Sequence, residues 1–371
     1  MFCPSGTPCV ASTRRIEDRL TPEACAKSSP DQRSMALPAR ICSEVIDIFY
    51  SIYDTINVIC EIHTAMSQNT AETRLTSLIK HLEGAYAPNT LRAYRQEMLE
   101  FISYCGEYGL CALPANPQAI SRFLIEQMQR GLKFASIRRK ASSISAVHRL
   151  SNLPDPTKDA EVHIALRKIK RSLGVRNHQA YPINHSTLER MLATTGQDLR
   201  GLRDRALLLL AYDSMRRRSE LVALRIEDIE FLHEQGASVL LRRSKTDQFG
   251  AGQWIHLGNA TTRAIEEWLT AAKLDSGFIL RSVASGNQVL REMTASRINR
   301  TLKRLATRAQ LPPNLIQQIS GHSTRVGAAQ DLMLGGASLP QIMVRGGWSK
   351  TDTVMRYIER CLLYTSPSPR D

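Results

Sequence analysis

The stretch that decides the fold is 320–357, SGHSTRVGAAQDLMLGGASLPQIMVRGGWSKTDTVMRY. It predicts a helix that begins near His322 and Arg325, runs apolar and Ala-rich, and stops at Gly335-Gly336, because glycine is favoured where a helix ends in a left-handed cap. Residues three apart share a helix face, so the imidazole of His322 and the guanidinium of Arg325 can converge on one point.

Two further helices are predicted in the same stretch. One begins near Ser338 and closes at Gly346-Gly347. The next begins within Ser349-Lys-Thr-Asp352, which has the pattern of a capping box, and it carries Tyr357. Trp348 falls at the break between them. A His, an Arg, a Trp and a Tyr are therefore distributed along short helices that are expected to pack as a unit.

The charge of the chain indicates a polyanionic partner. The 371 residues carry a formal net charge of +14, with a pI near 9.6. The first 70 residues hold six Lys/Arg and eight Asp/Glu, so the positive excess belongs to the remainder. Such an excess favours nucleic acid first and an anionic membrane second. A merely basic protein is the third interpretation.

Neither a metal site nor a membrane segment is expected. The eight cysteines form no CxxC pair and no Cys/His zinc spacing, and scattered single thiols fit a reducing cytoplasm. The most apolar early stretch, 41–66, is interrupted by four acidic residues, which makes it an amphipathic helix at most. The N-terminus lacks the pattern of a secretion signal.

The length of the chain and the positions of its Gly- and Pro-containing breaks predict two domains. Residues 1–70 are interpreted as a leader that is disordered apart from that one helix. Residues 71–174 are helical in periodicity throughout, and a Gly/Pro-containing linker, 175–185, separates them from a second domain over 186–360. Residues 361–371, CLLYTSPSPRD, look like a translated sequencing adapter, and their Pro/Ser pattern is not expected to be helical.

The ordered set His-x-x-Arg, Gly-Gly-Trp and a Tyr nine residues after the Trp resembles the C-terminal signature of the tyrosine recombinases, the phage-integrase family. Four landmarks in this order are far more specific than His-x-x-Arg alone. The resemblance covers about 71–360. It implies a mainly α fold: a helical, SAM-like core-binding domain, then a catalytic domain with a small β-hairpin or sheet. The implied function is a site-specific recombinase or integrase of phage or other mobile DNA.

The resemblance also selects the first catalytic residues. The family's first Arg stands three residues before a Glu, which selects Arg217 and Glu220. A shift of one residue turns a helical side chain by about 100°, so Arg216 and Arg218 are expected to be phosphate-contacting or surface groups instead. The strand-like segments SVLLRR and QWIHLG flank a Gly-containing loop and predict a hairpin with Lys245 near its tip.

The residue types suit phosphoryl transfer as the family performs it. Tyr357 is the implied nucleophile, whose phenolate attacks a DNA phosphorus and leaves a 3′-phosphotyrosyl link. Lys245 is the candidate acid for the departing 5′-oxygen. The guanidiniums of Arg217 and Arg325 provide bidentate bonds that a Lys cannot copy.

The remaining site residues assist. His322 and the indole N–H of Trp348 are expected to add hydrogen bonds, and His322 can also take the proton from the tyrosine. Glu220 is expected to orient its neighbours. The sequence shows neither a carboxylate cluster suited to Mg²⁺ nor a Walker loop, so no metal, cofactor or small-molecule substrate is expected. A phosphotyrosyl ester keeps the energy of the broken bond, which makes rejoining possible without ATP.

In the helical domain, five residues are expected to face DNA: Thr90, Arg92, Arg138, Arg139 and Lys140, the last three as a projecting basic triplet. For any one of them, a merely solvated surface is the alternative. The family implies duplex DNA with paired inverted-repeat sites, two subunits per site and a homotetramer on DNA, at the nucleoid in a bacterial cytoplasm. The rivals are a type IB topoisomerase and a non-catalytic DNA-binding protein that keeps the fold.

Overall fold

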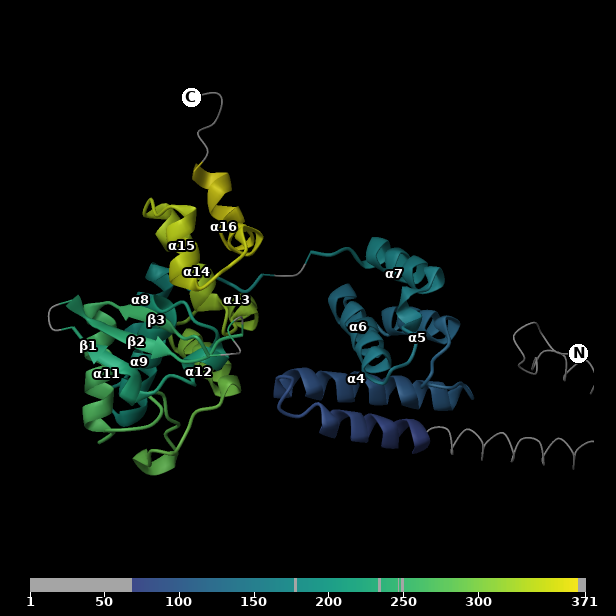
Figure 1. The fold of residues 1–371 in the computed structure, drawn as a ribbon. Coiled ribbons are helices and arrows are strands. Elements are labelled where there is room, and N and C mark those ends of the chain that lie inside the picture. The colour runs from purple at the N-terminus through teal and green to yellow at the C-terminus, as the bar shows by residue number, and fades with distance from the viewer. Residues whose placement is uncertain (1–68, 177–178, 233–234, 246, 248–249, 366–371) are drawn as a thin grey trace, which may run out of the picture. The chain divides into compact units, whose positions relative to one another are not determined.

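The computed structural model describes residues 69–176, 179–232, 235–245, 247 and 250–365 (Figure 1). The helix expected at 41–66, and all of the expected leader except its last two residues, lie outside these ranges. After Arg176 the chain divides into two compact units. The fold class is as predicted, mainly helical with a small antiparallel sheet. None of the helices within the described ranges is long and apolar enough to cross a membrane.

The first unit is a bundle of helices. They are 69–81, α4 (Pro88–Glu107), α5 (Pro117–Gln129), α6 (Phe134–Leu150) and α7 (Ala160–Leu173), with the 3₁₀ turn η2 (Pro156–Lys158) between the last two. Pro88 and Pro117 each occupy a first helical position, where a missing N–H costs nothing. The helices bury apolar residues at spacings of three and four, and Phe101 and Phe123 meet edge to face at the centre, with ring centroids 5.2 Å apart.

The second unit combines helices with the sheet. Its elements are α8 (His185–Leu192), α9 (Leu199–Asp213), α10 (Arg218–Leu221), η3 (Ile226–Asp228), β1 (Ile229–Phe231), β2 (Ala237–Leu241), β3 (Gln253–Leu257), α11 (Asn259–Ala271), η5 (Ser285–Asn287), α12 (Ala295–Arg308), α13 (Pro313–Gln318), α14 (Ser323–Leu334), α15 (Leu339–Gly346) and α16 (Thr351–Thr365).

The sheet contains the predicted hairpin and one further strand. β2 and β3 pair antiparallel, with Val239 opposite Ile255 and both side chains buried. β1 pairs with the other edge of β2. The sequence pattern did not reveal β1, because a three-residue edge strand is too short to show an alternation.

Two apolar clusters lie in this unit. The larger gathers α9, α11, α12 and the sheet around the fully buried Trp268. The smaller joins α14, α15 and α16, which Figure 1 shows close together. Its buried members are Met215, Ala328, Ala329, Ile342, Trp348, Val354 and Ile358.

The predicted helix boundaries in 320–357 are confirmed for α14 and α15. α14 ends at Leu334, before the glycine pair. α15 begins after Ser338, which forms a capping box with Gln341, and ends at Gly347 in the left-handed conformation, φ 63° and ψ 43°.

Two expectations about the ends of this unit need correction. α16 continues through 361–365, so the prediction that the chain cannot be helical from Cys361 is wrong for those residues. The prolines that would break the helix come only at 367 and 369. Within the expected linker, Tyr181 and Ile183 donate backbone hydrogen bonds to Gln318 and Ser323, so this part packs with the second unit.

Candidate active site

Glu220 reaches back to Arg217 at the start of α10. Arg217 is the N-cap with an extended backbone, φ −69° and ψ 150°. Its N–H donates to Glu220 Oε2 at 2.9 Å, and its Nη1 donates to Glu220 Oε1 at 2.7 Å. Burial opposes ionisation of Glu220, but these bonds outweigh burial and lower its pKa. Glu220 is therefore an anion that holds the Arg217 guanidinium in place.

The loop that carries Lys245 is attached to the same carboxylate. The N–H of Lys245 donates to Glu220 Oε1 at 3.4 Å. Further along the loop, Asp247 accepts backbone hydrogen bonds from Gly250, Ala251 and Gly252 at 2.8–3.1 Å, which lower its pKa. Sequence reasoning missed Asp247, although an Asp just before a Gly-rich segment is a known turn signal. Lys245 thus lies in the loop between β2 and β3, where it was predicted near the tip of the hairpin, and Asp247 organises this loop.

Arg325 is almost completely buried, with 1% of its surface exposed. Its Nη1 donates to the Met215 carbonyl and its Nη2 to the Gly346 carbonyl at 3.1 Å. Met215 reaches this bond from a left-handed backbone, φ 51°, which is rare for a non-glycine residue. Within the described residues, the buried Arg325 Nε has no hydrogen-bond partner. Burial, and after it the charge of Arg217, lowers the pKa of Arg325 to about 10.

Trp348 connects Arg325 to Tyr357. The Arg325 guanidinium lies over the Trp348 ring, 4.7 Å from its centroid. The Trp348 and Tyr357 rings are 5.4 Å apart between centroids. Tyr357 is half-buried on α16, and its carbonyl accepts a hydrogen bond from Gln330 of α14 at 3.0 Å. The three side chains thus form a continuous row.

His322 is the N-cap of α14, and its surface is exposed. Partial burial lowers its pKa, and the nearby cations Arg325, Arg218, Arg217 and Lys245 lower it further. An imidazole in these surroundings is neutral near pH 7 and can accept a proton.

The cations in this cluster exceed its carboxylates. Among the described residues, the guanidiniums of Arg216, Arg217 and Arg325 lie near the one carboxylate of Glu220, which leaves a charge of +2. Arg325 is held by neutral carbonyl oxygens rather than by a carboxylate. Buried charge of one sign without matching counter-charge favours an anionic ligand. Within the described ranges, no group of His, Cys, Asp and Glu is arranged to hold a metal ion.

Of the two arginines that flank Arg217, one is placed as expected. Arg218 is exposed, and its side chain packs against Gly321. The expectation for Arg216 is wrong, because this side chain is only 3% exposed and bonds to protein oxygens on three sides. The reason is that Arg217 precedes the helix: in extended backbone, neighbouring side chains point to opposite sides rather than 100° apart.

The five residues of the first unit that were expected to face DNA are placed differently from one another. Arg92 and Arg138 are exposed and Thr90 is half-buried. Arg139 is exposed, but its guanidinium pairs with Glu97 at 2.7 Å.

The expectation that Lys140 projects is wrong. Lys140 is 5% exposed, and its ammonium contacts Glu100 and, at 3.3 Å, Glu97. Both acids lie on α4, so the packing of α6 on α4 buries this lysine.

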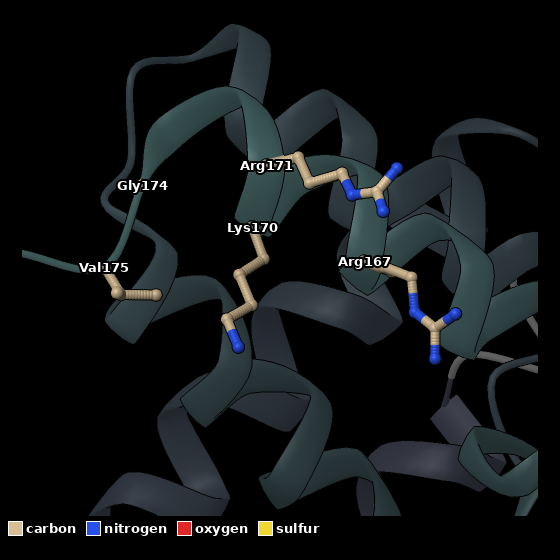
Figure 2. Close-up of a pocket in the computed structure, with 5 residues that line it drawn as sticks. All are labelled: Arg167, Lys170, Arg171, Gly174 and Val175. Atoms are coloured by element: carbon tan, nitrogen blue, oxygen red, sulfur yellow. The ribbon is translucent and has the colours of Figure 1, made fainter.

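A basic surface that the predicted set omitted lies on α7. Figure 2 shows Arg167, Lys170 and Arg171 extending from the last two turns of α7 beside Gly174 and Val175. These residues line an open depression of about 350 Å³. All three cations are exposed, and none makes an ion pair with a described residue. We call them the α7 basic face.

The comparison with known families agrees with this arrangement. Residues 182–361 match the phage integrase family, and residues 75–151 match the N-terminal SAM-like domain of phage integrases. The chain belongs to the phage integrase family of tyrosine recombinases. It is a tyrosine-type site-specific recombinase that acts on DNA.

Two relatives are similar to this recombinase over about three quarters of its length. An integrase/recombinase XerD homologue of Selenomonas ruminantium is 30% identical over 292 residues, which cover 76% of this chain and 84% of the relative. The Cre recombinase of Escherichia phage P1 is 25% identical over 290 residues, covering 74% and 84%. The XerD homologue is thus matched at a higher identity than Cre.

Solved structures share the fold of this recombinase at low sequence identity. The XerH recombinase bound to a palindromic difH substrate, in a post-cleavage complex, has a TM-score of 0.57 at 17% identity, with 78% of this chain and 81% of that chain covered. A λ integrase dimer bound to a COC′ core site has a TM-score of 0.52 at 16% identity, with 100% and 94% covered.

Proposed function

We propose that this recombinase cleaves duplex DNA through a 3′-phosphotyrosyl intermediate on Tyr357 and rejoins the strands through a Holliday junction. The observation that best supports this proposal is that the side chains of Arg325, Trp348 and Tyr357 lie in a row beside Arg217. The buried Arg325 Nε has no hydrogen-bond partner among the described residues. A phosphodiester seated there would receive donors from two guanidiniums and lie within reach of one phenol.

Each remaining group takes one role in the proposed reaction. His322 accepts the proton of the Tyr357 hydroxyl as the phenolic oxygen attacks phosphorus, and its lowered pKa leaves the imidazole in the neutral form that can take this proton near pH 7. The phosphorus–5′-oxygen bond breaks, and Lys245 gives the departing oxygen its proton. The Trp348 indole lies beside the phosphate, and Glu220 keeps Arg217 and the Lys245 loop in place. The reverse of these steps, with a 5′-hydroxyl from another strand, rejoins DNA.

The proposed partner is duplex DNA with paired inverted-repeat sites. Two copies occupy one site, and two sites meet in a homotetramer. The λ integrase structure contains a dimer bound to a core site, and the XerH structure contains a palindromic substrate, which supports this arrangement by analogy. In the first unit, Arg92, Arg138 and the α7 basic face are the proposed phosphate contacts.

Covalent trapping tests the proposal. Duplexes that bind the protein are selected from a random pool, nicked beside the cleavage position and incubated with it, and the protein–DNA adduct is resolved on a denaturing gel. We expect an adduct from the wild type, none from Tyr357→Phe, and an undiminished adduct from the control Tyr108→Phe, an exposed tyrosine of the first unit. An adduct formed by Tyr357→Phe would refute the assignment. Exchange between two such sites on one plasmid, rather than relaxation alone, tests the recombinase role.

A further inference from the structure

Arg216 is a buried cation that the proposed reaction does not use. It is 3% exposed, and its donors reach three different segments. Nε donates to the Ser214 carbonyl at 3.0 Å, Nη1 to Gln253 Oε1 at 2.9 Å, and Nη2 to the Arg345 carbonyl at 2.6 Å. Burial lowers its pKa, and all three bonds go to neutral oxygens. Such a site costs desolvation energy that an apolar side chain of similar size would avoid.

The three segments are those that position the proposed catalytic groups. Ser214 begins the turn that leads to Arg217. Gln253 is the first residue of β3, directly after the loop of Lys245. Arg345 is in the last turn of α15, immediately before the glycine pair and Trp348.

Arg216 and Arg325 bind adjacent positions of the same two turns. Arg216 bonds the carbonyls of Ser214 and Arg345, while Arg325 bonds those of Met215 and Gly346. Arg216 thus holds together the turns on which Arg325 depends. In addition, it reaches the hairpin through Gln253, which Arg325 does not.

The glycine pair before Trp348 leaves space for this arrangement. A Cβ on Gly347, whose φ is +63°, would lie 2.4 Å from Arg216 Nη1. A Cβ on Gly346 would lie 2.0 Å from the Trp348 ring. Both distances are below any real contact, so the turn approaches Arg216 on one side and Trp348 on the other.

We propose that Arg216 is a positioning residue that fixes the Trp348 turn and the Lys245 hairpin relative to Arg217. This inference rests on the proposed function, because it concerns the geometry of that same site. A displacement of about 1 Å in such a site can cost on the order of 10² in rate. Losing Arg216 should therefore slow cleavage more than it weakens DNA binding.

The test compares Arg216→Met with a matched control, Arg203→Met. Arg203 is also 3% exposed and lies in the same unit, but it bonds Asp204 and the Arg281 carbonyl instead of the site. Thermal unfolding, DNA dissociation constant and single-turnover adduct formation are measured well below the melting temperature of each variant. We expect both variants to bind DNA within a few-fold of the wild type. Only Arg216→Met should slow cleavage, by about 10²-fold.

Arg216→Lys and Gln253→Leu sharpen the test and cover the case in which Arg216→Met does not fold. Lysine keeps the charge but lacks the several fixed N–H donors of the guanidinium. The cleavage rate of Arg216→Lys should therefore lie between those of the wild type and Arg216→Met. Gln253→Leu removes only the contact to the hairpin. Its defect should be relieved on a substrate with sulfur at the 5′-bridging position, because a thiolate leaves without a proton. The defect of Arg216→Lys should be relieved only in part.

The outcomes separate this inference from the proposed function. If wild-type protein forms no adduct, the proposed function fails. If wild-type protein forms the adduct, and Arg216→Lys and Gln253→Leu cleave at the wild-type rate, the contacts of Arg216 are not needed for cleavage and the inference fails. The inference is equally overturned if Arg216→Met slows cleavage no more than Arg203→Met, or if its loss of rate equals its loss of DNA affinity.

Discussion

Paired cations of the first unit and the two buried arginines of the candidate active site are held in different ways. In the first unit, Arg130, Arg139, Lys140 and Arg149 all pair with carboxylates, at distances up to 3.8 Å. In the second unit, Arg216 and Arg325 are buried and bond neutral oxygens, and they share the neighbourhood of the single carboxylate Glu220.

This difference indicates which cations can act on a DNA phosphate. A cation that is neutralised by a neighbouring acid adds little to attraction for DNA, whatever its exposure. A buried guanidinium without a carboxylate is fixed in direction and acts strongly on one nearby anion. The α7 basic face is a third kind, exposed and without an ion pair to a described residue, and it suits salt-dependent binding of phosphates.

The strongest test of the comparison replaces Arg325 by Lys. Lysine has one ammonium in place of the fork and cannot bond Met215 and Gly346 while also presenting a donor to phosphate. We expect single-turnover cleavage to fall by about 10²–10³-fold, with DNA affinity changed only a few-fold. The control is Arg242→Lys, an exposed arginine of the same unit that pairs with Asp228. Equal effects of the two changes would contradict the special role of buried guanidiniums.

An intermediate effect is expected from the α7 basic face. Removing both Arg167 and Arg171 deletes two cations without a carboxylate partner in the described structure, whereas removing both Arg130 and Arg149 deletes two paired ones. The slope of log binding constant against log salt should become shallower by about 1.8 in the first double Ala variant and hardly change in the second. Cleavage at saturating DNA should be unchanged in the first. Identical slopes would show that pairing does not decide which cations bind DNA.

The smallest effect concerns histidine. The pKa of His322 is lowered in the folded protein, so the unfolded chain binds more protons just below the ordinary value of about 6.5. The stability that neutral His322 contributes is therefore complete above that value and is lost as pH falls toward the lower folded value. Buried His148 in the first unit acts in the same direction. Melting temperatures measured from neutral to acidic pH should decline less steeply in His322→Gln than in wild type. Parallel curves would exclude this contribution.

The sequence predicted the elements whose signals are local. The glycine pairs marked the ends of α14 and α15, and alternation around a Gly-rich loop marked the hairpin. Predicting the class of fold required nothing further than these signals and the family resemblance.

It did not predict side chains whose positions depend on distant partners. Arg216 and Arg218 are indistinguishable in an Arg-Arg-Arg run, and only the turn at Met215 decides which is buried. Lys140 was expected to be exposed because its acidic partners lie some 40 residues earlier on α4. The roles of Arg217, Lys245, His322, Arg325, Trp348 and Tyr357 come from the family resemblance, and the geometry brings these residues to one region.

The smaller apolar cluster beneath α16 bears on when the nucleophile Tyr357 is available in the site. Because the tyrosine helix is anchored to α14 and α15 and not to the larger cluster around Trp268, it can detach while the rest of the unit stays folded. Tyr357 can therefore be withdrawn from the site or returned to it at a free-energy cost below that of global unfolding.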